Sequence, residues 1–140
     1  MLYLDTSALA AYYCPEALSD LVEAEIMRAS SPLISQLVEV ELQSAVARKI
    51  REKSLTKMDG IEILTRFRLH LDSGCFRRLP IEPKHYDIAG TWISRFDVPL
   101  RTLDALHLAV CFGAEATLLT ADAGLAKAAK HFRVKVKLLS

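Results

Sequence analysis

Three aspartates stand at the ends of apolar stretches, next to small or hydroxyl-bearing residues. Asp5 closes the apolar run that begins the chain, and Asp104 lies near the start of an almost wholly apolar segment. Asp122 follows Thr120 in the short sequence TAD. Each aspartate could simply be the N-cap of a helix, where a carboxylate accepts hydrogen bonds from free backbone N–H groups. If the fold brings them together, however, the acids repel one another and need protons or a cation.

The cation that such a group favours is Mg²⁺ or Mn²⁺, because these ions bind oxygen ligands and a few carboxylates suffice to hold them. A bound divalent ion lowers the pKa of a water molecule and neutralises charge on a phosphate. The three aspartates therefore predict metal-assisted phosphoryl chemistry, with an activated water as the attacking group.

A fourth acid is available in the segment 37–53, which offers both Glu39 and Glu41. Helical spacing places Val38, Leu42 and Val46 on one apolar stripe, with one glutamate on each flank of it. Spacing alone leaves the choice between the two glutamates open, and either could be a solvated flank residue.

The elements that must position these acids alternate along the chain. Short apolar runs predict strands at 1–5, 32–36, 75–81, 116–120 and 134–139. Helical patterns lie at 6–13, 14–30, 37–53, 56–72, 83–96, 101–114 and 122–132. Pro15 is expected in the first turn of its helix, and Thr56 with Asp59 resembles a capping box.

Strands that alternate with helices predict an α/β fold, with a parallel sheet of four or five strands between helices on both faces. The 140 residues favour one domain, 1–140. Ligands bind such sheets outside the carboxyl ends of the strands. Asp5 and Asp122 both follow predicted strands, so both are expected at that edge.

Composition narrows the class of protein. Hydrophobic residues make up 51% of the chain, which suits a packed core, and no apolar stretch is long enough to span a membrane. Without a signal-peptide pattern, we expect a cytoplasmic protein. A net charge of +1 gives no global signal for nucleic acid. Three scattered cysteines suggest neither a disulfide framework nor a zinc site.

Several other chemistries find little support. His107 lies three residues after Asp104 and could join it on a metal, but a histidine packed against the core is the simpler interpretation. No GxxxxGK[ST] motif or GxSxG elbow occurs. A haloacid-dehalogenase-type phosphatase would need a second aspartate where Ser7 stands. The remaining histidines are expected in polar, exposed surroundings, and no sequence pattern indicates a partner for them: His70, His85 and His131.

Four stretches, taken together, resemble a known family. LYLDTSALA, ISQLVEVELQSAV, RTLDALHLA and LLTADAGLAKAA are similar, in order and spacing, to the motifs of PIN-domain ribonucleases. The similarity is greatest to the VapC-type toxins of prokaryotic toxin–antitoxin systems, and it covers nearly the whole chain. It implies a three-layer PIN-like fold and a Mg²⁺- or Mn²⁺-dependent endoribonuclease.

The resemblance also assigns residues. It implies that Asp5, Asp104 and Asp122 are catalytic and metal-binding, and it selects Glu41 as the fourth acid because the family's glutamate follows a strand-end serine by six residues. Ser7 and Thr120 would orient these carboxylates by hydrogen bonds.

The partners implied are an RNA substrate and a cognate antitoxin, and a homodimer is expected. An excess of apolar residues in the first two helices suggests a dimer or antitoxin groove, with ordinary core packing as the alternative: Leu9, Tyr12, Tyr13, Leu18, Leu21 and Val22. Two other functions stay open, namely a PIN scaffold that only binds RNA or protein, and another metal-dependent phosphoryl-transfer enzyme.

Overall fold

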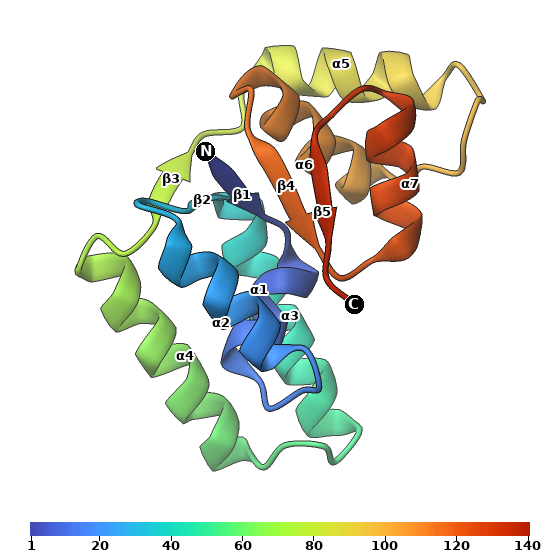
Figure 1. Cartoon of the computed structure of the whole chain (residues 1–140). Helices are drawn as coiled ribbons and strands as arrows, with labels where there is room; N and C mark the ends of the chain where they lie inside the picture. Colours follow the sequence, from blue (N-terminus) through green and yellow to red (C-terminus); the bar gives the residue numbers. More distant parts are fainter.

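Five short parallel strands form the centre of the computed structural model, which describes residues 1–140 (Figure 1). They are β1 (Leu2–Leu4), β2 (Leu33–Ser35), β3 (Arg77–Leu79), β4 (Thr117–Thr120) and β5 (Val136–Leu138). The strand order is β3-β2-β1-β4-β5, and every pairing is parallel. The predicted α/β class and strand number are confirmed.

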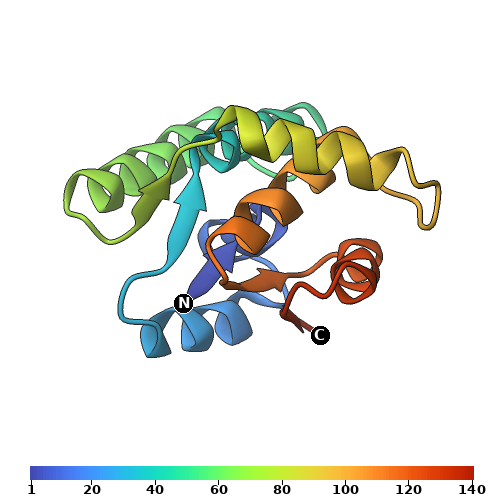
Figure 2. The ribbon, with the colours of Figure 1, turned by 90° about the horizontal axis from the view of Figure 1, so that it is seen from above.

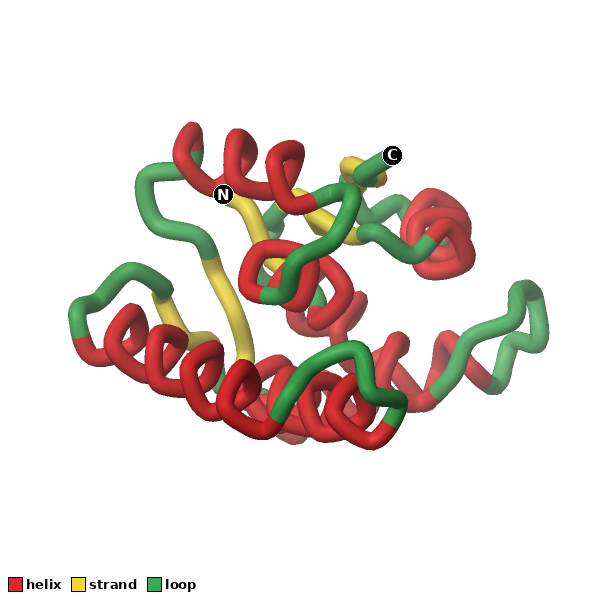
Figure 3. Tube along the Cα trace, turned by 90° about the horizontal axis from the view of Figure 1, so that it is seen from below, coloured by secondary structure: helices red, strands yellow, loops and turns green.

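Seven helices connect and cover the strands. They are α1 (Thr6–Tyr13), α2 (Ser19–Arg28), α3 (Gln36–Arg51), α4 (Lys57–Asp72), α5 (Pro83–Ile93), α6 (Thr102–Gly113) and α7 (Ala123–His131). From above, α3, α4 and α5 run along one side of the sheet, while α2 and α7 lie on the other (Figure 2). The view from below likewise shows the strands between helices on both sides (Figure 3). The three-layer arrangement is therefore confirmed.

The helix boundaries follow local chemistry. The capping box of α4 forms as predicted, with Thr56 and Asp59 each binding the other's backbone N–H. Gly74 has a φ of 74° just past the end of α4, where a left-handed residue closes the helix. The expectation for Pro15 is wrong. Helix α2 begins only at Ser19, because the Ser19 hydroxyl closes the preceding turn by donating to the carbonyl of Ala11 at 2.7 Å.

A large apolar core fills the space between sheet and helices, and a smaller apolar cluster lies between α5 and α6. Strands β1, β2 and β4 supply fully buried residues to the large core, among them Leu4, Ile34 and Leu119. Helix α6 contacts both α5 and β4, which explains why it is apolar on nearly every side. No helix of the chain combines the length and apolarity needed to cross a membrane.

The strand order has a consequence for function. From β1 the chain proceeds outward to β2 and β3, and then crosses back to place β4 and β5 on the other side of β1. Open α/β sheets bind ligands at the point where the order reverses, which here lies between β1 and β4. The residues directly after these two strands are Asp5, and Ala121 with Asp122.

Candidate active site

Asp5 lies at this reversal point and is almost completely buried, with 3% of its surface exposed. It is the N-cap of α1, and its Oδ1 accepts a hydrogen bond from the backbone N–H of Ala8 at 2.9 Å. Ser7 donates to the same oxygen at 2.7 Å, and Thr120 donates to Oδ2 at 2.6 Å. The carboxylate is therefore held in one orientation by three donors.

The two hydroxyl residues also connect Asp5 to the end of β4. Thr120 Oγ1 accepts a hydrogen bond from the N–H of Asp122 at 3.0 Å, and Ser7 Oγ accepts from the N–H of Ala121 at 2.9 Å. The parallel pairing of Leu4 with Leu119 brings these segments together. Ser7 and Thr120 thus lie where the resemblance expects the residues that orient the carboxylates.

Burial raises the pKa of Asp5 above its usual range, although the donors Thr120, Ala8 and Ser7 oppose that shift. No lysine or arginine forms an ion pair with this carboxylate. The ionised form of Asp5 therefore has no ion-pair partner in the protein, and a bound cation could supply one.

Glu41, rather than Glu39, faces the reversal point. The Oε1 atom of Glu41 accepts from Thr6 at 2.7 Å and is joined to His107 Nε2 at 2.5 Å. Burial raises the pKa of Glu41, but the hydrogen bond and charge of His107 and the Thr6 hydroxyl outweigh it, so the net shift is downward. Glu39 instead forms a two-pronged ion pair with Arg78 on β3, with its nearest N···O distance at 2.6 Å. The geometry agrees with the glutamate that the resemblance selects.

Asp104 and Asp122 both line a small cleft of about 210 Å³, whose wall also includes Arg101. Asp104 lies in the first turn of α6, and its partner is the exposed Arg101 at 3.4 Å. Asp122 is the N-cap of α7 and accepts from the N–H of Leu125 at 3.1 Å. The N-cap interpretation is correct for Asp5 and Asp122, but it accounts for neither the grouping nor Asp104.

The four acids lie around the reversal point and are connected in turn through intervening residues; together they are called the ring. Asp5 is linked through Thr120 to Asp122, which shares its cleft with Asp104. One helical turn after Asp104, His107 reaches Glu41, and the Thr6 hydroxyl beside Asp5 completes the ring.

The donor set of this ring fits a hard divalent cation, because it offers only carboxylate oxygens and only Asp104 has an arginine partner. In this structure, no three acidic, histidine or cysteine side chains lie close enough together to hold one ion. Asp5, Glu41, Asp104 and Asp122 are therefore gathered at one edge but do not converge on a point.

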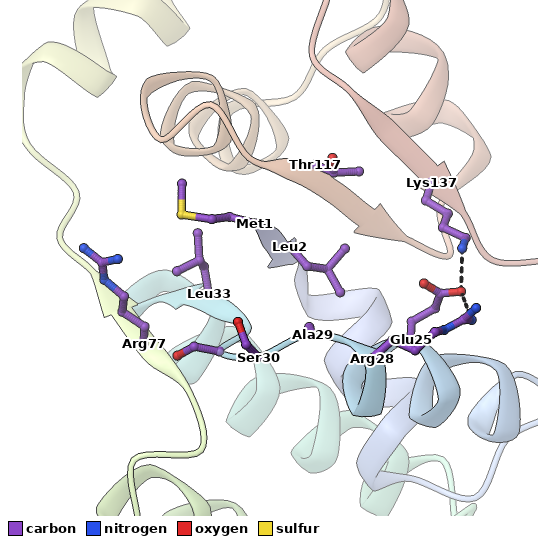
Figure 4. A pocket seen from close by; sticks show the side chains of 11 residues that line it. Met1, Leu2, Glu25, Arg28, Ala29, Ser30, Leu33, Arg77, Thr117 and Lys137 are labelled. Carbon is purple, nitrogen blue, oxygen red and sulfur yellow. Dashed lines mark hydrogen bonds and ion pairs between the residues drawn. The ribbon is translucent and has the colours of Figure 1, made fainter.

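A larger hollow, of about 660 Å³, lies at the opposite edge of the sheet and contains none of the four acids (Figure 4). Its only acid, Glu25, is already paired with both Arg28 and Lys137, each at 2.6 Å. The volume of a hollow alone therefore does not identify the candidate active site.

The histidines differ from expectation. His85 is buried and accepts the backbone N–H of Glu82 at 2.9 Å, and His70 is hydrogen-bonded to the Tyr13 hydroxyl. His131 is paired with Asp97. The expectation of an exposed side chain is wrong for His85, and each of the three histidines has a partner that no sequence pattern indicated. His107 is buried against the core, as predicted, but it also contacts Glu41, which the sequence did not reveal.

The suggested groove on the first two helices is largely absorbed by the core. Leu9, Tyr13 and Val22 are buried, and Leu21 is the only exposed residue of the six. Ordinary core packing accounts for most of that apolar excess.

The chain is similar to known proteins in sequence and in fold. The sequence profile of the PIN domain family matches residues 2–131. The chain is similar to FitAcB from Neisseria gonorrhoeae, at 20% identity and a TM-score of 0.70, over 97% of this chain and 96% of that one. It is also similar to VapC20 from Mycobacterium tuberculosis, a sarcin-ricin loop cleaving toxin, at 18% identity and a TM-score of 0.73, over 91% and 95%.

A third similar structure is VapBC2 from Rickettsia felis, bound to a DNA fragment from its promoter, at 20% identity and a TM-score of 0.67 over 100% of both chains. At these low sequence identities, the TM-scores show that the fold is shared. A search of curated proteins found no match.

Proposed function

This chain belongs to the PIN-domain family, and from that premise we propose that it is a Mg²⁺- or Mn²⁺-dependent endoribonuclease. The observation that carries the proposal is the ring of four acids at the reversal point of the sheet, which has one exposed arginine as its only arginine or lysine partner. Such a ring needs positive charge, and a phosphodiester substrate brings none.

Asp5, Glu41, Asp104 and Asp122 would hold the ion. When bound, a divalent ion lowers the pKa of a water molecule and offsets charge on the phosphate. The protein's own contribution is orientation: Ser7 and Thr120 fix the Asp5 carboxylate, while Thr6 and His107 fix Glu41. A carboxylate of the ring would accept the proton that the attacking water loses.

The deciding experiment is RNA cleavage with Mg²⁺ or Mn²⁺ by the native protein, Asp5→Asn and Asp104→Asn. Both variants keep the size of the side chain and remove one negative charge, so we expect a loss of at least about 100-fold in cleavage rate. Cleavage that survives both substitutions would refute the proposed site. Metal-independent RNA binding without any cleavage would instead favour the scaffold that only binds.

We further propose that the chain acts in the cytoplasm as the toxin of a pair, restrained by an antitoxin, and that it forms a homodimer. The similarity to FitAcB and VapBC2 supports a protein partner. A small adjacent gene for a DNA-binding protein, whose product co-purifies with this chain and suppresses cleavage, would support the pairing. Sedimentation of the isolated chain tests the dimer.

A further inference from the structure

The two oxygens of the Glu41 carboxylate have different surroundings. Both protein donors, the Thr6 hydroxyl and His107 Nε2, bind Oε1, at 2.7 Å and 2.5 Å. Oε2 has no hydrogen-bond partner in the protein. One oxygen is therefore anchored while the other is left available.

The anchor on Oε1 continues into the core. His107 Nδ1 is 2.8 Å from the Tyr3 hydroxyl, which is in turn 3.0 Å from Ser35 Oγ. Ser35 and Tyr3 are both fully buried, and His107 is 2% exposed. Ser35, Tyr3 and His107 thus form a buried chain of hydrogen bonds, the relay, which connects the end of β2 and the middle of β1 to Glu41 through α6.

Ser35 gives independent evidence that the relay is specific. It is the N-cap of α3, where a serine hydroxyl ordinarily accepts a backbone N–H of the first turn. Here Ser35 makes no such capping bond, and its hydroxyl is directed to Tyr3 instead. The Ser35 hydroxyl therefore binds Tyr3 in place of the capping hydrogen bond that a serine usually makes at this position.

The hydrogen positions follow from the available donors and acceptors. An ionised carboxylate only accepts, so His107 Nε2 must carry the hydrogen that meets Oε1. With a neutral ring, Nδ1 then accepts from Tyr3, and Tyr3 accepts from Ser35. A doubly protonated ring reverses the Tyr3 and Ser35 links but keeps the same donor to Glu41.

We propose that His107 is a positioning residue, which the relay locks in place so that Glu41 presents Oε2 to the divalent cation. A free glutamate on a helix flank samples many rotamers, and fixing it before the ion arrives lowers the cost of binding. This inference rests on the proposed function, since it concerns the same cation.

The test measures Mn²⁺ affinity by calorimetry, without RNA, in the native protein and three variants. His107→Leu removes the donor to Oε1, and Tyr3→Phe removes the partner that orients the ring. His107→Gln restores an N–H donor on a side chain of similar reach. We expect Mn²⁺ binding about 10- to 100-fold weaker for H107L, a smaller loss for Y3F, and recovery to within about threefold of native for H107Q.

The chain offers a matched control in a second tyrosine–histidine contact. Tyr13 is buried, and its hydroxyl is 2.5 Å from His70 Nδ1, but neither residue touches an acid of the ring. Tyr13→Phe should therefore lower stability about as much as Tyr3→Phe and leave Mn²⁺ affinity unchanged. Equal loss of affinity in both would show a general effect of core disruption and overturn the relay.

The remaining outcomes are separable. Native-like Mn²⁺ affinity in H107L, beside normal binding by the native chain, would overturn the relay and leave the proposed function standing. Absence of Mn²⁺ binding by the native chain would overturn both. If H107L fails to fold, the Mn²⁺ affinities of Y3F and H107Q still test the relay. A metal-free crystal structure of Y3F should also show Glu41 displaced from Thr6.

Discussion

Asp5 shows how one residue can serve both the fold and the chemistry. Its side chain caps α1 and accepts three hydrogen bonds. The two bonds to Oδ1 need an acceptor rather than a charge, whereas the Thr120 bond to Oδ2 needs the second carboxylate oxygen. The charge is a burden to the metal-free fold, since burial raises the pKa of this carboxyl. When the pKa of a carboxyl group is higher in the folded state than in the unfolded state, the protein loses stability as pH rises through the interval between the two values.

Asp5→Asn should therefore separate folding from function. At neutral pH without metal, we expect this variant to be about as stable as the native protein, because the amide oxygen keeps the acceptor for the cap and the removal of the buried charge offsets the loss of the acceptor that faces Thr120. Urea unfolding at pH 7 in the presence of a chelator measures this. A large loss of stability would mean that the charge itself holds the fold.

The two glutamates of α3 give a second comparison at this scale. Glu41→Gln should lower cleavage at least about 100-fold, because it removes a negative ligand from the ring. Glu39→Gln is the matched control: its ion pair with Arg78 lies at the surface, where such pairs contribute about 0–1 kcal/mol. Cleavage should survive in Glu39→Gln, and the reverse result would exchange the roles of the two residues.

Among the elements, α5 carries a pH-sensitive cap. His85 accepts the backbone N–H of Glu82 through Nδ1, which is possible only while that nitrogen is unprotonated. Burial lowers the pKa of His85, with the charge of Lys84 as a second cause. A depressed pKa contributes stability that is present above the unfolded value of 6.5 and is lost as pH falls through the folded value.

His85→Asn tests this cap, because an asparagine at the same position offers an acceptor that does not titrate. Between pH 7.5 and pH 5, we expect the native protein to lose about 1 kcal/mol more unfolding free energy than the variant. Urea titrations of both proteins at the two pH values provide the comparison. Parallel losses would exclude His85 as the titrating group.

The elements also show how far the sequence could be interpreted. Local signals were sufficient for α4, where Thr56, Asp59 and Gly74 mark both ends, and these interactions span only a few residues. They were insufficient for α2, whose start depends on a bond from Ser19 back to Ala11 in the preceding helix. Pro15, four residues before Ser19, resembled the first residue of a helix. In the structure, residues 15–18 precede α2 and are not helical.

At the scale of the whole molecule, the sheet topology explains which site residues could be predicted. Asp5 and Asp122 follow strands, so the rule for parallel sheets places them at one edge without coordinates. The contacts of Glu41 with His107, of His107 with Tyr3, and of Glu39 with Arg78 join residues far apart in sequence. No local pattern encodes such pairings, and choosing Glu41 required the resemblance.

Cation binding should stabilise the whole chain. An ion that binds only the folded state adds about 2.7 kcal/mol at a concentration 100 times its dissociation constant, roughly 8 °C in Tm. We expect this rise for the native protein with Mn²⁺ and little or none for Asp5→Asn, measured by calorimetric melting with and without the ion. An equal rise in both proteins would place the ion elsewhere.

The position of β1 between β2 and β4 has a consequence for synthesis. Asp5 is synthesised before the other three acids, and the hydroxyl that fixes its Oδ2 lies 115 positions later. A nascent chain that has exposed only three strands carries Asp5 and Glu41 but lacks α6, β4 and α7, and with them half of the acids. Long-range pairings of this kind form late in folding. A nuclease whose site is assembled in this order would stay inert beside the ribosome until α7 has been synthesised.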